Sequence, residues 1–265
     1  QHMKIGSIDI PSRLALAPMA GVTDLAFRQI CSELGAGLTC TELVSSKALC
    51  YQDHKTRGLL KQFPGEHPAA AQIFGSDPER MARGAQLALE YSGADLIDIN
   101  MGCPAPKITG NGEGSALMKE PGVAARVIEA VVKASALPVS VKFRKGWDSG
   151  HVNCVDFARM AEASGAAFVT IHGRTRDQMY SGAADWEVIA EAKAALSIPV
   201  IGNGDVTGGS SAIAMRDYTG CDGIMIARGA LGNPYVFQEV KAAFAGVPYT
   251  PPSNAERLDL AIAHV

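Results

Sequence analysis

Short runs of apolar residues alternate with segments of helical periodicity along most of the chain. The short runs are apolar at consecutive positions, which is typical of parallel strands whose two faces are both covered. The pattern therefore predicts strands at residues 14–17, 38–43, 69–74, 96–100, 138–143, 168–172, 199–202 and 223–227.

The segments between these runs carry the start and stop signals of helices. Thr23 is the expected N-cap of the first helix, and Pro78 and Pro121 fall in the first turns of two others, where proline is tolerated. These signals predict helices at residues 24–34, 78–91, 121–134, 152–163, 186–196, 211–218 and 235–244.

The spacing of the predicted strands indicates the fold class. Successive strand ends are separated by about 30 residues, the length of one βα unit. Eight such units in this length of chain predict an α/β fold, a (β/α)8 TIM barrel. A doubly wound sheet would more often carry a GxGxxG motif after its first strand, where residues 17–21 read Ala-Pro-Met-Ala-Gly. We expect the barrel to occupy residues 4–247.

Residues 248–265 differ in composition from the barrel. Residues 248–252 are rich in proline, and residues 253–256 (Ser-Asn-Ala-Glu) form a capping box. Leu258, Ile262 and Val265 then begin an apolar helical face. We expect this segment to be a linker and the first helix of a truncated or disordered C-terminal helical domain.

Composition narrows the functional classes. The 265 residues carry a net charge of −3, so contact with RNA would require a local basic patch. The sequence has no apolar run long enough to cross a membrane and no visible signal peptide. Its six cysteines form no CxxC pair and no metal-ligand spacing, which favours reduced thiols. We therefore expect a cytoplasmic protein without a membrane or metal partner.

Polar residues stand at the carboxyl ends of the predicted strands, where barrel enzymes place their active sites. The glycine-rich segments 202–205 and 208–209, together with Arg228 and Gly229, favour phosphate binding after the last two strands. Because the strand-end residues share one end of the barrel, we expect them to form one rim: Glu42, Gln72, Asn100, Lys142, Arg144, His172, Arg174, Asn203, Asp205 and Arg228.

Two residues on this rim have chemistry that the pattern alone leaves open. Lys142 lies in an apolar strand, where an ammonium group needs a partner. It could form a Schiff base, or it could face an electron-rich cofactor. Cys103 follows Asn100 on a loop that contains Pro104 and Pro106, and its thiol could donate a proton, attack carbon or be inert.

Taken together, the motifs resemble those of the tRNA-dihydrouridine synthase family over residues 4–247. The pair formed by Asn-x-Gly-Cys-Pro and His-Gly-Arg-Thr-Arg is the most specific part of the resemblance. The matching segments are residues 17–24, 41–45, 72–75, 98–104, 141–147, 171–176, 180–186, 203–205 and 227–229.

The resemblance implies an NAD(P)H-dependent flavin oxidoreductase that reduces specific tRNA uridines to 5,6-dihydrouridine. Hydride would pass from N5 of FMN to uracil carbon 6, and Cys103 would protonate carbon 5. Asn100, Arg144 and Arg174 would bind the substrate. The expected donor is NADPH or NADH, the partner is tRNA, and the protein is a monomer. The residues that would hold FMN are Pro18, Met19, Gln72, Lys142, His172, Asn203, Gly204, Asp205, Ala227 and Arg228.

Three alternatives remain at this point. A flavin barrel acting on a free pyrimidine, such as a dihydroorotate dehydrogenase, would share Lys142 and the phosphate loops. An aldolase-like barrel would use Lys142 to form an imine. A non-catalytic RNA-binding module is poorly supported by the charge balance.

Overall fold

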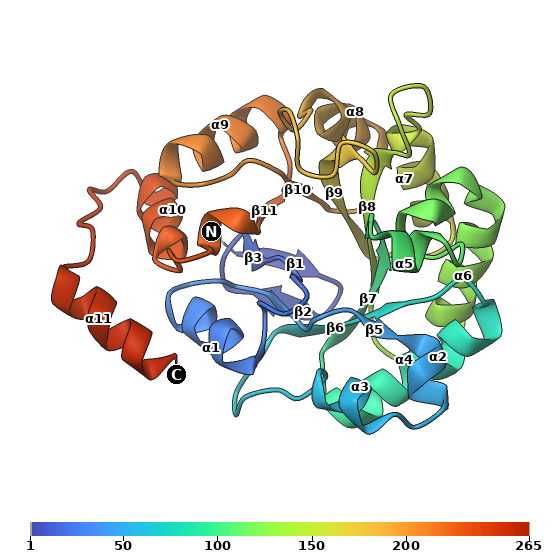
Figure 1. Cartoon of the computed structure of the whole chain (residues 1–265). Coiled ribbons are helices and arrows are strands. Elements are labelled where there is room, and N and C mark those ends of the chain that lie inside the picture. The colour runs from blue at the N-terminus through green and yellow to red at the C-terminus, as the bar shows by residue number, and fades with distance from the viewer. Residues whose placement is uncertain (1, 265) are drawn as a thin grey trace.

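The computed structural model describes residues 2–264 and shows a ring of parallel strands surrounded by helices (Figure 1). Strands β4 and β5 pair in turn along β6 and share one position in the ring, and an Ala15–Leu38 bridge closes it. This is the TIM barrel expected from the strand spacing. Around the ring the order is β3 (Leu14–Leu16), β11 (Gly223–Ile226), β10 (Val200–Asn203), β9 (Phe168–Thr175), β8 (Val139–Gly146), β7 (Leu96–Met101), β6 (Ala69–Phe74) and β4 (Thr39–Cys40), with β5 (Val44–Ser45) beside β6.

The predicted helices form the outer layer, with ends that differ from the expected ones by at most two residues. The expected N-cap of the first helix was wrong. Asp24 caps it by accepting the N–H of Phe27, whereas the Thr23 hydroxyl bonds to the backbone of Met19. The helices are α1 (Leu25–Glu33), α4 (Pro78–Ser92), α6 (Pro121–Ala134), α7 (Cys154–Ala163), α8 (Glu187–Ala195), α9 (Gly209–Thr219) and α10 (Val236–Ala245).

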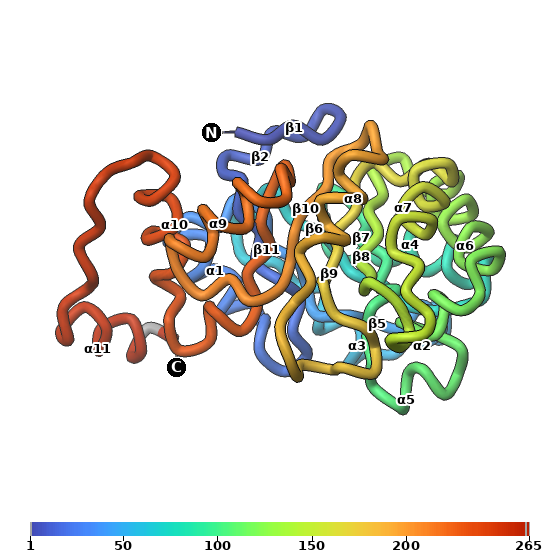
Figure 2. Tube along the Cα trace, turned by 90° about the horizontal axis from the view of Figure 1, so that it is seen from above, coloured from blue at the N-terminus to red at the C-terminus, as the bar shows by residue number. Residues whose placement is uncertain are grey.

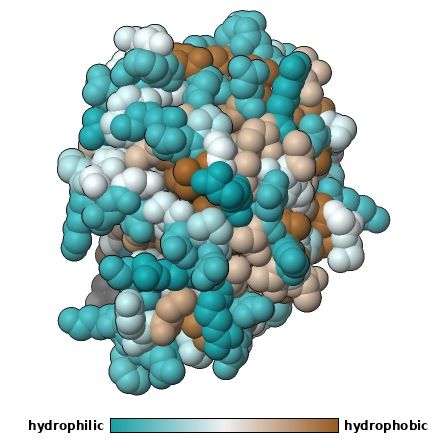
Figure 3. Space-filling view, turned by 90° about the vertical axis from the view of Figure 1, so that its right-hand side faces the viewer, coloured by the Kyte–Doolittle hydropathy of each residue, from teal (hydrophilic) through white to brown (hydrophobic). Residues whose placement is uncertain are grey.

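The outer face of this helical layer is largely hydrophilic where Figure 3 shows it. Across residues 2–264, no helix has both the length and the apolar character needed to span a bilayer.

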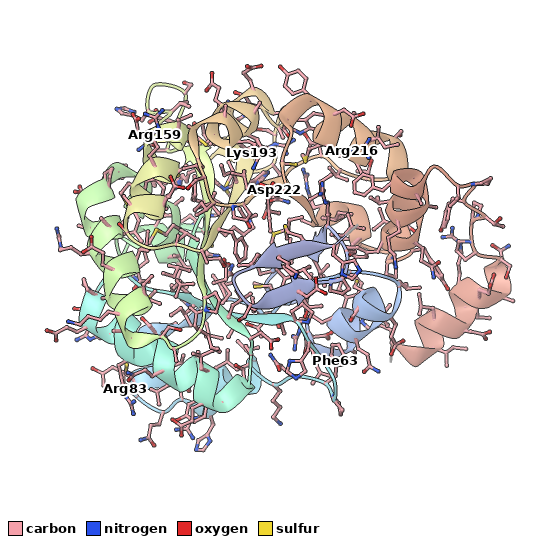
Figure 4. The ribbon with its side chains drawn as sticks, turned by 180° about the vertical axis from the view of Figure 1, so that it is seen from behind. Phe63, Arg83, Arg159, Lys193, Arg216 and Asp222 are labelled. Carbon is pink, nitrogen blue, oxygen red and sulfur yellow. The ribbon has the colours of Figure 1, made fainter. Side chains whose placement is uncertain are left out.

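Several short elements were not predicted. A hairpin of β1 (Met3–Ile5) and β2 (Ile8–Ile10) lies at the opposite end of the barrel from α5 (Pro106–Thr109), as Figure 2 shows. Its buried side chains pack against residues inside the barrel, so that the hairpin covers this end (Figure 4). The others are α2 (Ser46–Cys50), α3 (His54–Gly58), and the 3-10 turns η1 (Gly114–Lys119) and η2 (Arg228–Ala230).

The interior of the barrel changes from apolar to polar along its axis. Leu96 on β7 packs with Phe168 and other interior residues near the hairpin. Alternate residues of a strand face the same side, so Asp98 and Asn100 follow Leu96 into the interior. The polar end of this interior positions the site.

A buried ion pair fixes the loop that precedes β6. Arg28 on α1 donates from Nε to Oε1 of Glu66 at 2.7 Å, and both side chains are 1% exposed. Glu66 also accepts hydrogen bonds from Thr39 and from the N–H of Phe63, which Figure 4 labels. The pair thereby links α1, β4 and this loop.

Helix α11 (Asn254–Ala263) begins with the expected capping box and lies apart from the barrel in Figure 1. The Tyr235 hydroxyl donates to the carbonyl oxygen of Glu256, and the rings of Phe27 and His264 stack at 5.7 Å. Leu258 and Ile262 are exposed, and Val265 lies outside the described residues. The continuation of this segment into a helical domain stays a prediction.

Candidate active site

A cavity of about 520 Å³ opens at the carboxyl ends of the strands. It meets a second cavity of about 290 Å³ over the loops that follow β10 and β11. The rim predicted from the strand ends is present in part. Seven of its ten predicted residues line a cavity, whereas Glu42, Gln72 and Arg174 do not. Most of the expected site residues line one or both cavities: Pro18, Met19, Asn100, Cys103, Lys142, Arg144, His172, Asn203, Gly204, Asp205, Ala227 and Arg228.

Cys103 is held in the cavity wall by its backbone. Its N–H donates to Oδ1 of Asn100 at 2.9 Å, and the Gly102 N–H donates to the same oxygen at 3.1 Å. Its carbonyl oxygen accepts bonds from the N–H and the hydroxyl of Ser115. The side chain is half-buried and shares the cavity with Lys142 and Arg228, as the sequence predicted.

Lys142 projects from β8 into the interior and donates from Nζ to Oδ1 of Asn203 at 3.3 Å. The amide of Asn203 is held in turn by a bond to the carbonyl oxygen of Met225. Burial lowers the pKa of Lys142 to about 8, and Arg144 adds to this effect, whereas the Asp98 carboxylate opposes it. An ammonium group with a single acceptor and an open side toward the cavity suits an electron-rich ligand.

His172 stays neutral in this environment. Burial lowers its pKa to about 2, and the nearby charges of Lys142, Arg144, Arg174 and Arg228 contribute to the shift. A neutral imidazole can donate or accept a hydrogen bond but has no proton to release as an acid near pH 7.

The loops after β10 and β11 carry groups that suit an anion. Gly204 has φ of +129°, and a Cβ atom on Gly229 would overlap the carbonyl oxygen of Val206, so both positions require glycine. Within residues 2–264, the backbone N–H groups of these two glycines have no hydrogen-bond acceptor. Arg228 is 47% exposed and only loosely paired with Asp205, at 3.4 Å. These groups fit a phosphate.

Two expected site residues do not line either cavity. Gln72 is fully buried beneath the rim, where its amide bonds to Asp98 and Asn100. Arg174 is 2% exposed and pairs with Asp205 at 2.8 Å. It also donates to the carbonyl oxygens of Ser181 and Gly182. Its bonds hold the loop between β9 and α8.

Arg144 lines the cavity, but its Nε and Nη1 groups are occupied. They donate to the carbonyl oxygens of Gly102, Thr175 and Met179. Burial lowers the pKa of the Arg144 guanidinium to about 10. Its bonds connect the Cys103 loop with the loop between β9 and α8.

Sequence reasoning missed two features. Tyr180 lines both cavities, with the guanidinium of Arg228 at 4.9 Å and that of Arg144 at 5.8 Å from its ring. Asp98 lies buried below the rim, and burial raises its pKa against the effects of Gln72, Ser140 and Lys142. Its position in an apolar strand is the same signal that identified Lys142.

The residues present fit a flavin mononucleotide. The glycine loops and Arg228 suit its phosphate, while the lysine side chain suits the electron-rich edge of its ring. Among the described residues, no group of three or more histidine, cysteine or acidic side chains could hold a metal ion.

Fold and site together define an enzyme that works at the carboxyl end of a parallel barrel. The dihydrouridine synthase (Dus) family model matches residues 15–265. The chain therefore belongs to the dihydrouridine synthase family and is an oxidoreductase, which confirms the resemblance seen in the sequence.

Two curated relatives are similar over nearly the whole chain. tRNA-dihydrouridine synthase B of Pasteurella multocida (strain Pm70) is 42% identical over 264 residues, or 99% of this chain and 79% of the relative. The protein of the same name from Escherichia coli (strain K12) is 43% identical over 264 residues, or 99% of this chain and 82% of the relative.

Solved structures show the same fold at low sequence identity. Morphinone reductase in complex with tetrahydroNAD has a TM-score of 0.65 at 13% identity, covering 97% of this chain and 93% of that chain. A 2-naphthoyl-CoA reductase complex has a TM-score of 0.72 at 11% identity, covering 94% of this chain and 52% of that chain.

Proposed function

We propose that this protein reduces specific uridines of tRNA to 5,6-dihydrouridine, with FMN as its cofactor and NADPH or NADH as the electron donor. One observation carries the proposal: the cavity lined by Cys103 and Lys142 adjoins the cavity over the glycine loops, and Arg228 lines both. Membership in the dihydrouridine synthase family supports the substrate class.

The rim divides into two parts toward the cofactor. Pro18, Met19, Lys142 and His172 would surround the ring, with Gln72 below them. Asn203, Gly204, Asp205, Ala227 and Arg228 would hold the ribityl chain and the phosphate. When bound, the flavin supplies the hydride that adds to carbon 6 of the uracil ring.

Cys103 supplies the proton. Hydride addition at carbon 6 would leave negative charge toward carbon 5, and the Cys103 thiol in the cavity wall would donate its proton there. Lys142 remains cationic below about pH 8 and stabilises negative charge on the cofactor side. Asn100, Arg144 and Arg174 hold the loops that enclose the base.

A uridine inside folded tRNA must leave its stack to enter this cavity. Lys145 lies at the carboxyl end of β8, and Lys107 and Arg176 follow β7 and β9. These three cations would contact tRNA phosphates despite the net charge of −3. We further propose that residues 4–247 act as the catalytic domain of a cytoplasmic monomer.

The first test is whether the purified protein shows the absorbance of a bound flavin. We expect a yellow protein that releases FMN on denaturation. With NADPH it should form dihydrouridine in an unmodified tRNA transcript and leave free uridine and dihydroorotate unchanged. Turnover of dihydroorotate without tRNA would favour the free-pyrimidine enzyme instead. A colourless protein whose Lys142 is trapped by borohydride with a carbonyl substrate would favour the aldolase.

A further inference from the structure

A continuous series of hydrogen bonds runs through the barrel interior from Asp98 to the Cys103 loop. Oδ2 of Asp98 accepts from Nε2 of Gln72 at 2.6 Å. Oε1 of Gln72 accepts from Nδ2 of Asn100 at 2.9 Å. Oδ1 of Asn100 then accepts the N–H groups of Gly102 and Cys103. Two side-chain amides thus connect a buried carboxyl group to the backbone of Cys103.

The direction of this series is fixed at both ends. Backbone N–H groups can only donate, so Asn100 must present its oxygen to the loop and its NH2 group to Gln72. Gln72 must then present its oxygen to Asn100 and its NH2 group to Asp98. The carboxyl oxygen of Asp98 accepts this last bond, and each amide consequently has one orientation.

Burial makes the series sensitive to the loss of a member. Gln72 is 0% exposed, Asp98 is 4% and Asn100 is 8%. A buried amide that loses its partner is not rescued by bulk water, so it pays the full cost of desolvation or rotates to a new partner. Asn100 has the Cys103 backbone as its other partner, and rotation upstream would therefore loosen the loop.

We propose that Asp98 is a positioning residue for Cys103, acting through the amides of Gln72 and Asn100. This inference rests on the proposed role of Cys103 as the proton donor. Asp98 never touches the cavity, and its effect on the reaction passes through the orientation of two amides.

Two substitutions separate this role from the charge of Asp98 beside Lys142. Asp98→Leu removes both the charge and the acceptor. Asp98→Asn removes the charge but keeps an oxygen for Gln72. Its NH2 group can donate to the Ser140 hydroxyl, which lies 2.5 Å from Oδ1 of Asp98 in the wild-type protein. Ser140→Ala is the matched control, because it removes the other partner of Asp98 and leaves the series intact.

The measurement is the rate at which iodoacetamide alkylates Cys103 in the flavin-loaded protein without tRNA, followed on the Cys103 peptide by mass spectrometry. We expect Asp98→Leu to raise this rate about tenfold, the effect of losing one strong buried hydrogen bond. Asp98→Asn and Ser140→Ala should stay close to wild type. In turnover, Asp98→Leu should lower kcat and leave KM for tRNA nearly unchanged.

Equal rates for Asp98→Asn and Asp98→Leu, or no rise in either, would overturn the proposal. If Asp98→Leu does not fold, Gln72→Leu takes its place in the test, because it interrupts the series at its middle. A wild-type alkylation rate in Gln72→Leu would then overturn the proposal. The alkylation rate is measured without tRNA, so the two proposals can fail separately. If only the proposed function is wrong, turnover of tRNA is absent but the alkylation rates of Asp98→Leu and Asp98→Asn still differ.

Discussion

Nζ of Lys142 lies 3.3 Å from Oδ1 of Asn203, and this contact joins β8 to β10 across the inner face of β9. The lysine stands next to the phosphate loop because of this contact, since Gly204 and Asp205 directly follow Asn203. Under the proposed function, this one contact would support both the residues at the flavin ring and those at its phosphate.

Replacement of Cys103 by alanine should leave the flavin bound and slow uridine reduction by roughly 100-fold or more, because the proton donor is lost. Single-turnover oxidation of the reduced enzyme by tRNA measures this step. Cys50→Ala is the control, since Cys50 is also half-buried and bonds to the carbonyl oxygen of Arg80, outside the cavity. Full turnover by Cys103→Ala would exclude the thiol as the acid.

Replacement of Lys142 by methionine should stabilise the flavin-free fold at neutral pH. The lysine pKa falls from 10.5 to about 8 on folding. Between these values the unfolded chain holds a proton that the folded protein has released, so this group makes the free energy of unfolding rise with pH. Below pH 8 the buried Lys142 ammonium group lowers the free energy of unfolding by its full amount, on the order of 2–3 kcal/mol.

Urea titrations at pH 7 and pH 10 test this effect. Lys142→Met should exceed the wild-type stability at pH 7 and lose most of that advantage at pH 10. Lys133→Met is the control, because Lys133 is exposed on α6. An advantage that is the same at both pH values would contradict the assigned cause.

His172→Asn should protect the fold against acid. The pKa of His172 drops from 6.5 to about 2 on folding, so below pH 6.5 the unfolded chain binds a proton at this residue and the folded protein does not. The free energy of unfolding therefore falls as the pH decreases through this range. At pH 4 the variant should retain on the order of 2–3 kcal/mol more of its neutral-pH stability than wild type. His54→Asn is the control, because His54 is exposed. If the stability of wild type and His172→Asn fell equally with decreasing pH, the shift in the pKa of His172 would be disproved.

Arg228→Ala should weaken FMN binding about tenfold by removing a charge-assisted contact to the phosphate. Riboflavin lacks the phosphate, so its affinity should not change. Fluorescence titration of both ligands gives the ratio, and Arg216→Ala on α9 controls for the loss of a surface charge. Equal losses for FMN and riboflavin would place Arg228 away from the phosphate.

Arg28→Ala should destabilise the barrel by about 3–5 kcal/mol, because it leaves the Glu66 carboxylate buried without its cation. The exposed Arg216–Asp217 pair offers the contrast, and Arg216→Ala should cost less than about 1 kcal/mol. Chemical denaturation of both variants decides this. A small effect for Arg28→Ala would mean that Thr39 and the Phe63 N–H suffice to hold Glu66.

Much of this architecture was predictable because it follows from the hydrophobic pattern of short segments of the chain. Lys142 lies between Val141 and Phe143 in a largely apolar run, and the Cys103 loop follows another such run. Such runs identify both the element and the end of the barrel where the polar residues meet.

The remainder depends on partners that are distant in the sequence. Arg174 and Gln72 look like ligand-binding residues in the sequence, yet Asp205 and Asp98 occupy them in the structure. The hairpin at the other end was missed because three-residue strands carry no measurable period. The strand predicted at residues 38–43 is interrupted between β4 and β5. Glu42 lies in this interruption, and its carboxylate accepts the N–H of Gly21.

The hairpin that covers the far end of the barrel has a kinetic consequence. Met3, Ile5 and Ile10 pack into that end, and the cavity opens at the carboxyl end of the barrel. Under the proposed function, the dinucleotide donor and the tRNA would use this same mouth, and the oxidised donor would leave before the tRNA enters. Steady-state rates plotted reciprocally at several donor concentrations should therefore give parallel lines, the signature of a double-displacement enzyme.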